Sequence, residues 1–134
     1  MRVIADTNII VSAIFFEGKP REFLLEWFNN KFDLICSEEI YQEYIATIKR
    51  ISEKYKDEVN KEILSVLHDK LVFVQNLYKD SYSRDPDDDK FINCARSAGI
   101  DFLVTGDKDL LILREVDQIK IITVSEFLHH IVIN

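Results

Sequence analysis

The chain has 134 residues, a net charge of −7 and 47% hydrophobic residues, with only three glycines and two prolines. This length suits one domain, residues 1–134, with an ordinary hydrophobic core, and the composition excludes a disordered or low-complexity protein. The negative charge argues against broad electrostatic attraction to nucleic acid, but it is compatible with a local acidic site that binds divalent cations.

The sequence also bears on where the protein works. No apolar run reaches the roughly 18 residues of a membrane span, and the N-terminus lacks the basic region and cleavage site of a signal peptide. Cys36 and Cys94 each lie in an apolar context, which is typical of reduced core thiols. We therefore expect a cytoplasmic protein.

The chain begins with a strand and a helix. An apolar run at residues 3–5 stops abruptly at Asp6, which is how a buried parallel strand ends when its last residue reaches a solvent-filled crevice. Thr7 or Asn8 is then expected to cap a buried first helix, which Gly18 ends.

The rest of the chain alternates helices and strands. Apolar residues at helical spacing predict six further helices. The first two begin at Pro20 and after the N-cap Ser37, and a third lies near residues 63–67. The fourth runs from the polar loop 81–89 to Gly99, the fifth spans residues 108–113, and the last begins at Ser125. Residues 52–62 are predicted to form the exposed tip of a helical hairpin. The later strands are predicted at residues 32–36, 71–74, 102–104 and 119–123. Five strands separated by helices indicate an α/β fold, in which a parallel sheet is covered by helices on both faces.

Acidic residues occur where an α/β fold brings chain segments together. Asp6 follows the first strand, and Asp107 follows the strand at residues 102–104. Ligands bind outside the carboxyl ends of such strands, at the point where the winding direction switches. For other acids a simpler explanation is available. Residues 87–89 could serve solely to stabilise the dipole of the following helix, and Glu43 could be ordinary surface charge.

Several acids at one site would require a cation, because carboxylates held close together repel one another. Oxygen ligands without histidine or cysteine favour Mg²⁺ or Mn²⁺ over zinc. His129 and His130 are adjacent and therefore point in different directions on a helix. We interpret them as packing or interface residues and not as metal ligands.

These motifs resemble the PIN-domain family, in particular the VapC-like toxin components of toxin–antitoxin systems. The matching pieces are Asp6-Thr7-Asn8 with Ser12, Glu43, Asp85-Pro86-Asp87-Asp88-Asp89-Lys90-Phe91, and Val104-Thr105-Gly106-Asp107-Lys108-Asp109-Leu110-Leu111. Their order and spacing cover nearly the whole chain. The resemblance implies a metal-dependent ribonuclease with Mg²⁺ or Mn²⁺ as cofactor and with the sheet order 3-2-1-4-5.

The resemblance also implies roles for individual residues. By position, the acids that would bind the metal and catalyse RNA hydrolysis are Asp6, Glu43, Asp88 and Asp107. The polar residues that would support them are Asn8, Ser12, Thr105 and Asp109. Cations that flank the expected site are candidate RNA contacts, and for each of them ordinary solvated surface charge is the alternative. They are Lys19, Arg21, Lys90, Lys108 and Arg114.

Helix geometry separates two neighbouring acids. Successive helical residues turn by about 100°, so with Phe91 and Ile92 buried, Asp88 projects towards the margin of the buried face. On the same reasoning, Asp89 should look into solvent. We therefore expect Asp88 to lean towards Asp6 and Asp107.

The C-terminal helix predicts an assembly. Its apolar residues exceed what one packed helix face requires, and they are Phe127, Leu128, Ile131, Val132 and Ile133. We therefore expect a homodimer, as the resemblance also implies, with contact to a cognate antitoxin nearby.

Two other functions are alternatives for an α/β domain with an acidic site. A receiver-type signalling domain needs two adjacent acids after the first strand and an acid after the third, where this chain has only Asp6 and the sequence Val74-Gln75-Asn76. The stronger alternative is a catalytically silent PIN fold that binds RNA or protein.

Overall fold

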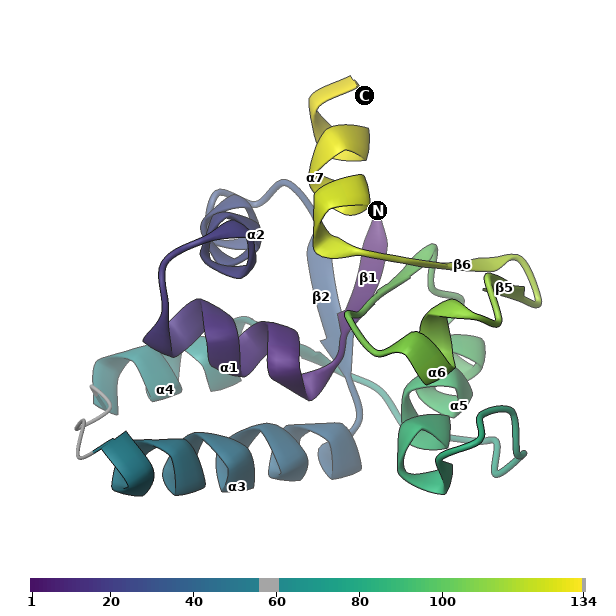
Figure 1. Cartoon of the computed structure of the whole chain (residues 1–134), viewed down its shortest axis with the longest axis horizontal. Coiled ribbons are helices and arrows are strands. Elements are labelled where there is room, and N and C mark those ends of the chain that lie inside the picture. Colours follow the sequence, from purple (N-terminus) through teal and green to yellow (C-terminus); the bar gives the residue numbers. More distant parts are fainter. Residues whose placement is uncertain (56–60, 134) are drawn as a thin grey trace.

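The computed structural model describes residues 1–55 and 61–133, and within these ranges six strands form one sheet (Figure 1). The strands are β1 (Arg2–Ala5), β2 (Asp33–Cys36), β3 (Val72–Phe73), β4 (Phe102–Val104), β5 (Glu115–Val116) and β6 (Ile119–Ile122). Their order is β3-β2-β1-β4-β6-β5. Neighbouring strands are parallel except for β5 and β6, which pair antiparallel. The predicted parallel order is therefore confirmed, with β6 as its fifth strand.

The predicted number of strands was wrong by one, because β5 was not expected. It is only two residues long and forms a hairpin with β6. The two turn residues, Asp117 and Gln118, both have positive φ angles, 48° and 71°, as in the type I′ turns that suit hairpins. The usual Asn-Gly or Asp-Gly signal for such a turn is missing, so the sequence pattern did not reveal it.

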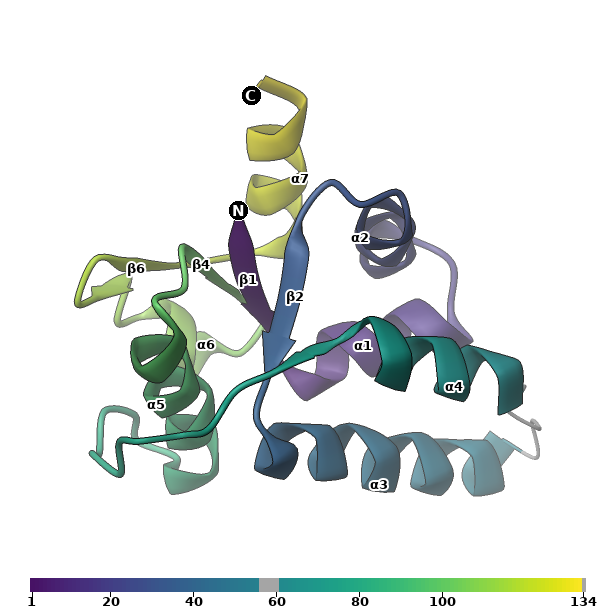
Figure 2. The ribbon, with the colours of Figure 1, turned by 180° about the vertical axis from the view of Figure 1, so that it is seen from behind.

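Helices cover both faces of the sheet (Figures 1 and 2). One side carries α1 (Thr7–Phe15), α2 (Lys19–Phe28), α3 (Glu38–Tyr55) and α4 (Lys61–Lys70). The other side carries α5 (Asp89–Ala98), which follows the 3₁₀ turn η1 (Pro86–Asp88), and α6 (Lys108–Leu111). The last helix, α7 (Val124–Ile133), packs against α2. Part of the predicted hairpin tip, residues 56–60, lies outside the described residues.

The first helix starts and ends differently from the prediction. Asp6, and not Thr7 or Asn8, is its N-cap, because the Asp6 Oδ1 atom accepts a hydrogen bond from the Ile9 amide (3.1 Å). The helix ends at Phe15, before Gly18. Gly18 has a φ of 135°, which favours glycine, and it directly precedes α2.

Other predicted helix ends are confirmed. The Ser37 hydroxyl accepts a hydrogen bond from the Ile40 amide (3.2 Å), which makes it the N-cap of α3. Gly99 ends α5 in the left-handed conformation with a φ of 63°. Cys36 and Cys94 are buried free thiols, and burial raises the pKa of each to about 12.

Aromatic packing joins α7 to the sheet. The ring of Phe127 is fully buried and lies 5.0–5.8 Å, centroid to centroid, from the rings of Phe23, Phe32 and Phe102. One face of α7 is therefore part of the core. Among the described residues, no helix combines the length and the apolar character needed to cross a membrane.

Candidate metal centre

The carboxyl ends of β1 and β4 meet at the switch point of the sheet. The two strands pair in register up to Ala5 and Val104, and the Asp6 amide donates a hydrogen bond to the Val104 carbonyl (3.0 Å). Helix α1 then leaves on one side of the sheet, whereas α6 lies on the other (Figure 1). The crevice beyond these two strand ends is where open α/β sheets bind ligands.

Asp6 is a buried carboxylate at this point, with only 5% of its surface exposed. Its Oδ1 atom accepts from Ile9, and its Oδ2 atom accepts a hydrogen bond from the Thr105 hydroxyl. Burial raises the pKa of Asp6, and the charge of Asp107 adds to this, while the hydrogen bonds from Thr105 and from the backbone oppose it. A carboxylate held in this way is stabilised by a nearby positive charge.

Thr105 fixes Asp6 relative to Asp107. It is completely buried, donates to Asp6, and accepts a hydrogen bond from the Asp107 amide (3.0 Å). The Asp107 Oδ1 atom in turn accepts from the Asp109 amide (2.8 Å), so Asp107 is the N-cap of α6. One side chain thus connects acids that follow two different strands.

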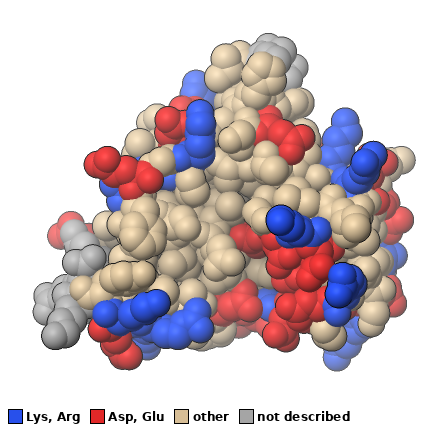
Figure 3. Space-filling model, in the orientation of Figure 1, with Lys and Arg blue, Asp and Glu red and all other residues tan. Residues whose placement is uncertain are grey.

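Three carboxylates come together beside this link. Asp88, Asp107 and Asp109 each place an oxygen so that the three atoms lie within 4.8 Å of one another. Asp88 comes from η1, whereas the other two come from the start of α6. In Figure 3, acidic side chains gather over the region where α5 and α6 lie in Figure 1.

Asp88 is strongly perturbed in this group. Burial raises the pKa of Asp88 to about 7, together with a hydrogen bond to Asp107 and the negative charges of Asp107, Asp85 and Asp6. Its Oδ2 atom is buried and has no hydrogen-bond partner among the described residues. An unpaired buried carboxylate oxygen next to two further carboxylates fits a divalent cation, which prefers oxygen ligands.

Glu43 borders the centre from α3. Its Oε2 atom accepts a hydrogen bond from the Thr7 hydroxyl, next to Asp6 in the chain, and its Oε1 atom lies 2.8 Å from the Lys90 ammonium group. The Lys90 side chain is only 11% exposed. Glu43 therefore has a positive partner within the protein, and it is not one of the three clustered carboxylates. The contacts of Glu43 with Thr7 and Lys90 were not predicted from the sequence.

The supporting residues lie at different distances from the acids. Thr105 and Asp109 contact the acids directly, as described above. Asn8 and Ser12 are one turn apart on α1, where Asn8 is exposed and Ser12 is half-buried.

Four of the expected RNA-binding cations differ in their contacts. Lys19 pairs with Glu22 (3.6 Å) and lines a groove between α2 and α7. Arg21 donates two hydrogen bonds to carbonyls at the C-terminal end of α1, away from Asp6. Lys90 is paired with Glu43. Lys108 is exposed beside Asp107, and it forms no ion pair with a carboxylate in the part of the chain that the structure describes.

The expected exposure of Asp89 was wrong. Its side chain is buried, with 8% of its surface exposed, and its Oδ1 atom accepts hydrogen bonds from the amides of Tyr82 (3.0 Å) and Ser83 (2.8 Å). The reason is that the segment at residues 76–83 lies along α5. It covers a face of the helix that the helix pattern alone predicted to be exposed to solvent.

A ladder of polar side chains holds this segment. Asn93 donates to and accepts from the backbone of Asp80 (3.0 and 3.1 Å), and Ser97 accepts from the Leu77 amide (2.8 Å). With Asp89, these residues recur every four positions and so form one face of α5. That spacing was the available sequence signal for a covered polar face.

Comparison with known proteins identifies the family. A sequence model described as a PIN domain matches residues 2–109. This is more than half of the chain, and the protein therefore belongs to the PIN-domain family. Neither a curated protein nor a solved structure matched the chain. Membership of this family generally indicates nuclease activity with a divalent metal, and the three clustered carboxylates agree with that.

The raised pKa of Asp88 predicts a pH-dependent stability of the metal-free protein. The folded-state pKa of about 7 lies above the ordinary value of 3.8, so the folded state binds this proton more tightly than the unfolded state. The resulting stability is fully present below the ordinary pKa and is lost as the pH rises through about 7. Thermal unfolding in EDTA should therefore show a melting temperature that falls between about pH 5 and about pH 8.

Asp88→Asn tests whether Asp88 causes this pH dependence, because the substitution removes the titrating group. It should flatten the pH dependence and raise the melting temperature at the alkaline end, whereas Asp87→Asn, at an exposed neighbour, should leave the slope unchanged. Equal slopes in the wild type and Asp88→Asn would contradict the assignment.

The buried Asp89 predicts a stability effect of a different kind. Asp89→Ala leaves two backbone amides without their acceptor and should lower the free energy of unfolding by about 1–3 kcal/mol. The exposed control Asp87→Ala should stay within about 0.5 kcal/mol of the wild type. Urea denaturation measures both, and faster proteolysis at residues 76–83 in Asp89→Ala alone would locate the change. Equal stability of the two variants would contradict the stabilising role of the Asp89 hydrogen bonds.

Proposed function

We propose that the protein is a metal-dependent endoribonuclease whose centre is formed by Asp6, Glu43, Asp88 and Asp107, with Mg²⁺ or Mn²⁺ as cofactor. The observation that carries this proposal is the buried Asp88 Oδ2 atom, unpaired among the described residues and surrounded by other carboxylates. Such a group is unfavourable without a cation. Oxygen ligands suit these two metals.

The residues of the proposed centre have different roles. Asp88 and Asp107 would offer oxygens to the cation, with Asp109 beside them as a supporting acid. Thr105 holds the Asp6 side chain and the Asp107 backbone in place. A bound divalent cation supplies a nucleophile at neutral pH and neutralises charge on the scissile phosphate. Lys108 is the proposed phosphate contact beside the acids.

A catalytically silent PIN fold is the second candidate. The observation that favours it is the ion pair between Glu43 and Lys90, which neutralises one of the four proposed acids without a metal. In that case the centre should have little affinity for Mn²⁺, and Mn²⁺ should not raise the melting temperature. A clear stabilisation by Mn²⁺ supports the nuclease.

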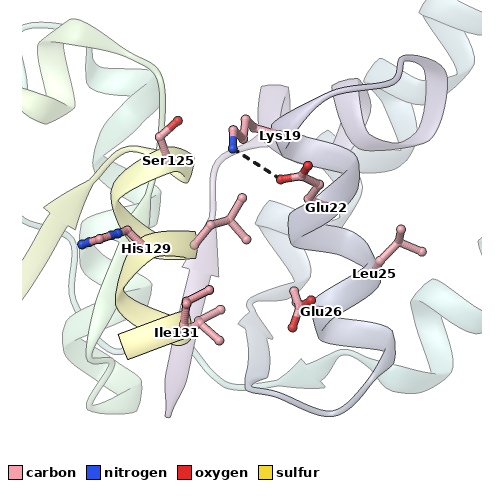
Figure 4. Close-up of a pocket in the computed structure, with 9 residues that line it drawn as sticks. Lys19, Glu22, Leu25, Glu26, Ser125, His129 and Ile131 are labelled. Atoms are coloured by element: carbon pink, nitrogen blue, oxygen red, sulfur yellow. Dashed lines mark ion pairs between the residues drawn. The ribbon is translucent and has the colours of Figure 1, made fainter. Parts of the chain in front are cut away.

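The motifs that match PIN-domain toxins support a further part of the proposal, that the nuclease is the toxin of a toxin–antitoxin pair. A cognate antitoxin then needs a surface on this chain, and so does a second copy. A groove partly lined by apolar side chains lies between α2 and α7, with a volume of about 490 Å³ (Figure 4).

We assign this groove to a second copy of the chain. Leu25 of α2 is 52% exposed and Val132 of α7 is 84% exposed, and both line it together with Leu128 and Ile131. Burial of such side chains would favour association. His129 also lines the groove, whereas His130 packs on Phe102 with ring centroids 4.8 Å apart. The side chain of Ile133 lies outside the described residues.

The purified protein should cleave single-stranded RNA in Mg²⁺ or Mn²⁺ and stop in EDTA. Asp88→Asn should abolish cleavage and weaken Mn²⁺ binding measured by calorimetry, because it removes a carboxylate from the cluster. Asp87→Asn is the matched control at an exposed acid and should retain most activity. Cleavage that persists in EDTA, or an active Asp88→Asn protein, would refute the proposed centre.

The protein should be a homodimer by light scattering at tens of micromolar. Val132→Glu places a charge in the apolar groove and should give a monomer, because burying an unpaired charge is costly. Ile112→Glu, at a side chain that is 73% exposed outside the groove, should remain dimeric. A monomeric wild type would exclude this assembly.

A further inference from the structure

A line of side chains extends along α3 from the acidic centre. Because successive helical residues turn by about 100°, Glu43, Thr47, Arg50 and Lys54 lie on one face, at positions i, i+4, i+7 and i+11. The buried face of the helix is formed by other residues, namely Ile40, Tyr44 and Ile48. In Figure 3, Lys and Arg side chains lie over α3, on the same side of the molecule as the acidic group.

The two cations of this line are available for a ligand. Arg50 and Lys54 are both exposed. Neither forms an ion pair with a carboxylate of the described residues. This distinguishes them from Lys90 and Arg21, which are engaged within the protein.

An exposed aromatic pair lies at the far end of the line. Phe16, at the end of α1, is 51% exposed, and Tyr55, at the end of α3, is 53% exposed. Their rings contact edge to face with centroids 6.1 Å apart, and the Lys54 ammonium group lies 5.4 Å from the Tyr55 ring centroid. Large aromatic side chains exposed together usually mark a binding surface.

We propose that a single strand of RNA lies along this face of α3, with phosphates on Arg50 and Lys54 and an unpaired base against Phe16 and Tyr55. We call this surface the α3 track. From Glu43 to Lys54 the helix rises by about 16 Å, at 1.5 Å per residue, which is the length of several nucleotides. This inference rests on the proposed function, which places the scissile phosphate at the acids.

Charge and ring chemistry favour RNA over protein at the α3 track. Cations beside exposed aromatic rings are the combination that holds single strands, since phosphates pair with the cations and bases stack on the rings. The net charge of −7 and the clustered carboxylates repel RNA at long range. A local track of positive charge next to the acids offsets this repulsion where the strand must enter.

RNA binding without cleavage tests the α3 track. Fluorescence anisotropy with a labelled single-stranded RNA in EDTA measures affinity separately from activity. The double variant Arg50→Gln/Lys54→Gln should bind at least about tenfold more weakly. A plot of the logarithm of its binding constant against the logarithm of the salt concentration should have a slope that is shallower by about 1.4, or about 0.7 for each lost phosphate contact. Tyr55→Ala should weaken binding about fivefold or more.

The matched control carries the same change of charge elsewhere. Lys49→Gln/Lys31→Gln alters two exposed cations. Lys49 is turned by about 100° from Arg50 on α3 and therefore lies outside the track, so this variant should bind within about twofold of the wild type. If both double variants lose affinity equally, net charge and not the track explains binding, and the proposal fails. It also fails if Arg50→Gln/Lys54→Gln changes the oligomeric state while RNA affinity stays the same, because the face then contacts protein.

Cleavage separates failure of the track from failure of the proposed function. In Mn²⁺, the Arg50→Gln/Lys54→Gln variant should raise KM and leave kcat unchanged, since the acids are intact. Track-dependent RNA binding by a protein that never cleaves RNA would refute the nuclease and retain the track. Normal KM and normal affinity in the double variant would refute the track and retain the nuclease. Arg50→Lys, which keeps the charge, should keep most of the affinity.

Discussion

The contact between Thr105 and Asp6 is the constraint on which the rest of the centre depends. It joins residues 99 positions apart at the ends of two buried, paired strands. Because the Thr105 hydroxyl also accepts from the Asp107 amide, the start of α6 is held in the same arrangement. The sheet thereby fixes two acids before any ligand binds, which is the preorganisation that a catalytic site requires.

Electrostatic repulsion shapes the remaining contacts. The four acids of the proposed centre are each compensated differently. Asp6 accepts neutral hydrogen bonds, Glu43 pairs with Lys90, and Asp107 caps a helix. Asp88 has the least compensation from its neighbours and accordingly the pKa raised to about 7. This uncompensated carboxylate is the reason why a cation is proposed at Asp88.

Much of this could be predicted from the sequence because strand ends are marked by abrupt changes of residue type. Asp6 and Asp107 follow buried apolar runs, and the structure places both at the switch point, with Asp88 beside Asp107. The partners of Asp89 and Lys90 were not predicted, because Asp89 binds backbone amides of an irregular segment and Lys90 pairs with Glu43 on a different helix, α3. The helical wheel that favoured Asp88 considered only packing on the sheet and could not show that residues 76–83 cover the other side of α5.

The first turn of α5 therefore connects three parts of the molecule through three consecutive residues. Asp88 faces the start of α6, Asp89 holds the segment at residues 76–83, and Lys90 reaches Glu43 on α3. Inserting or deleting one residue here would rotate all three side chains by about 100° and disconnect all three at once. Among homologous chains, changes of length should therefore accumulate before this turn, in the irregular segment, and be rare within it.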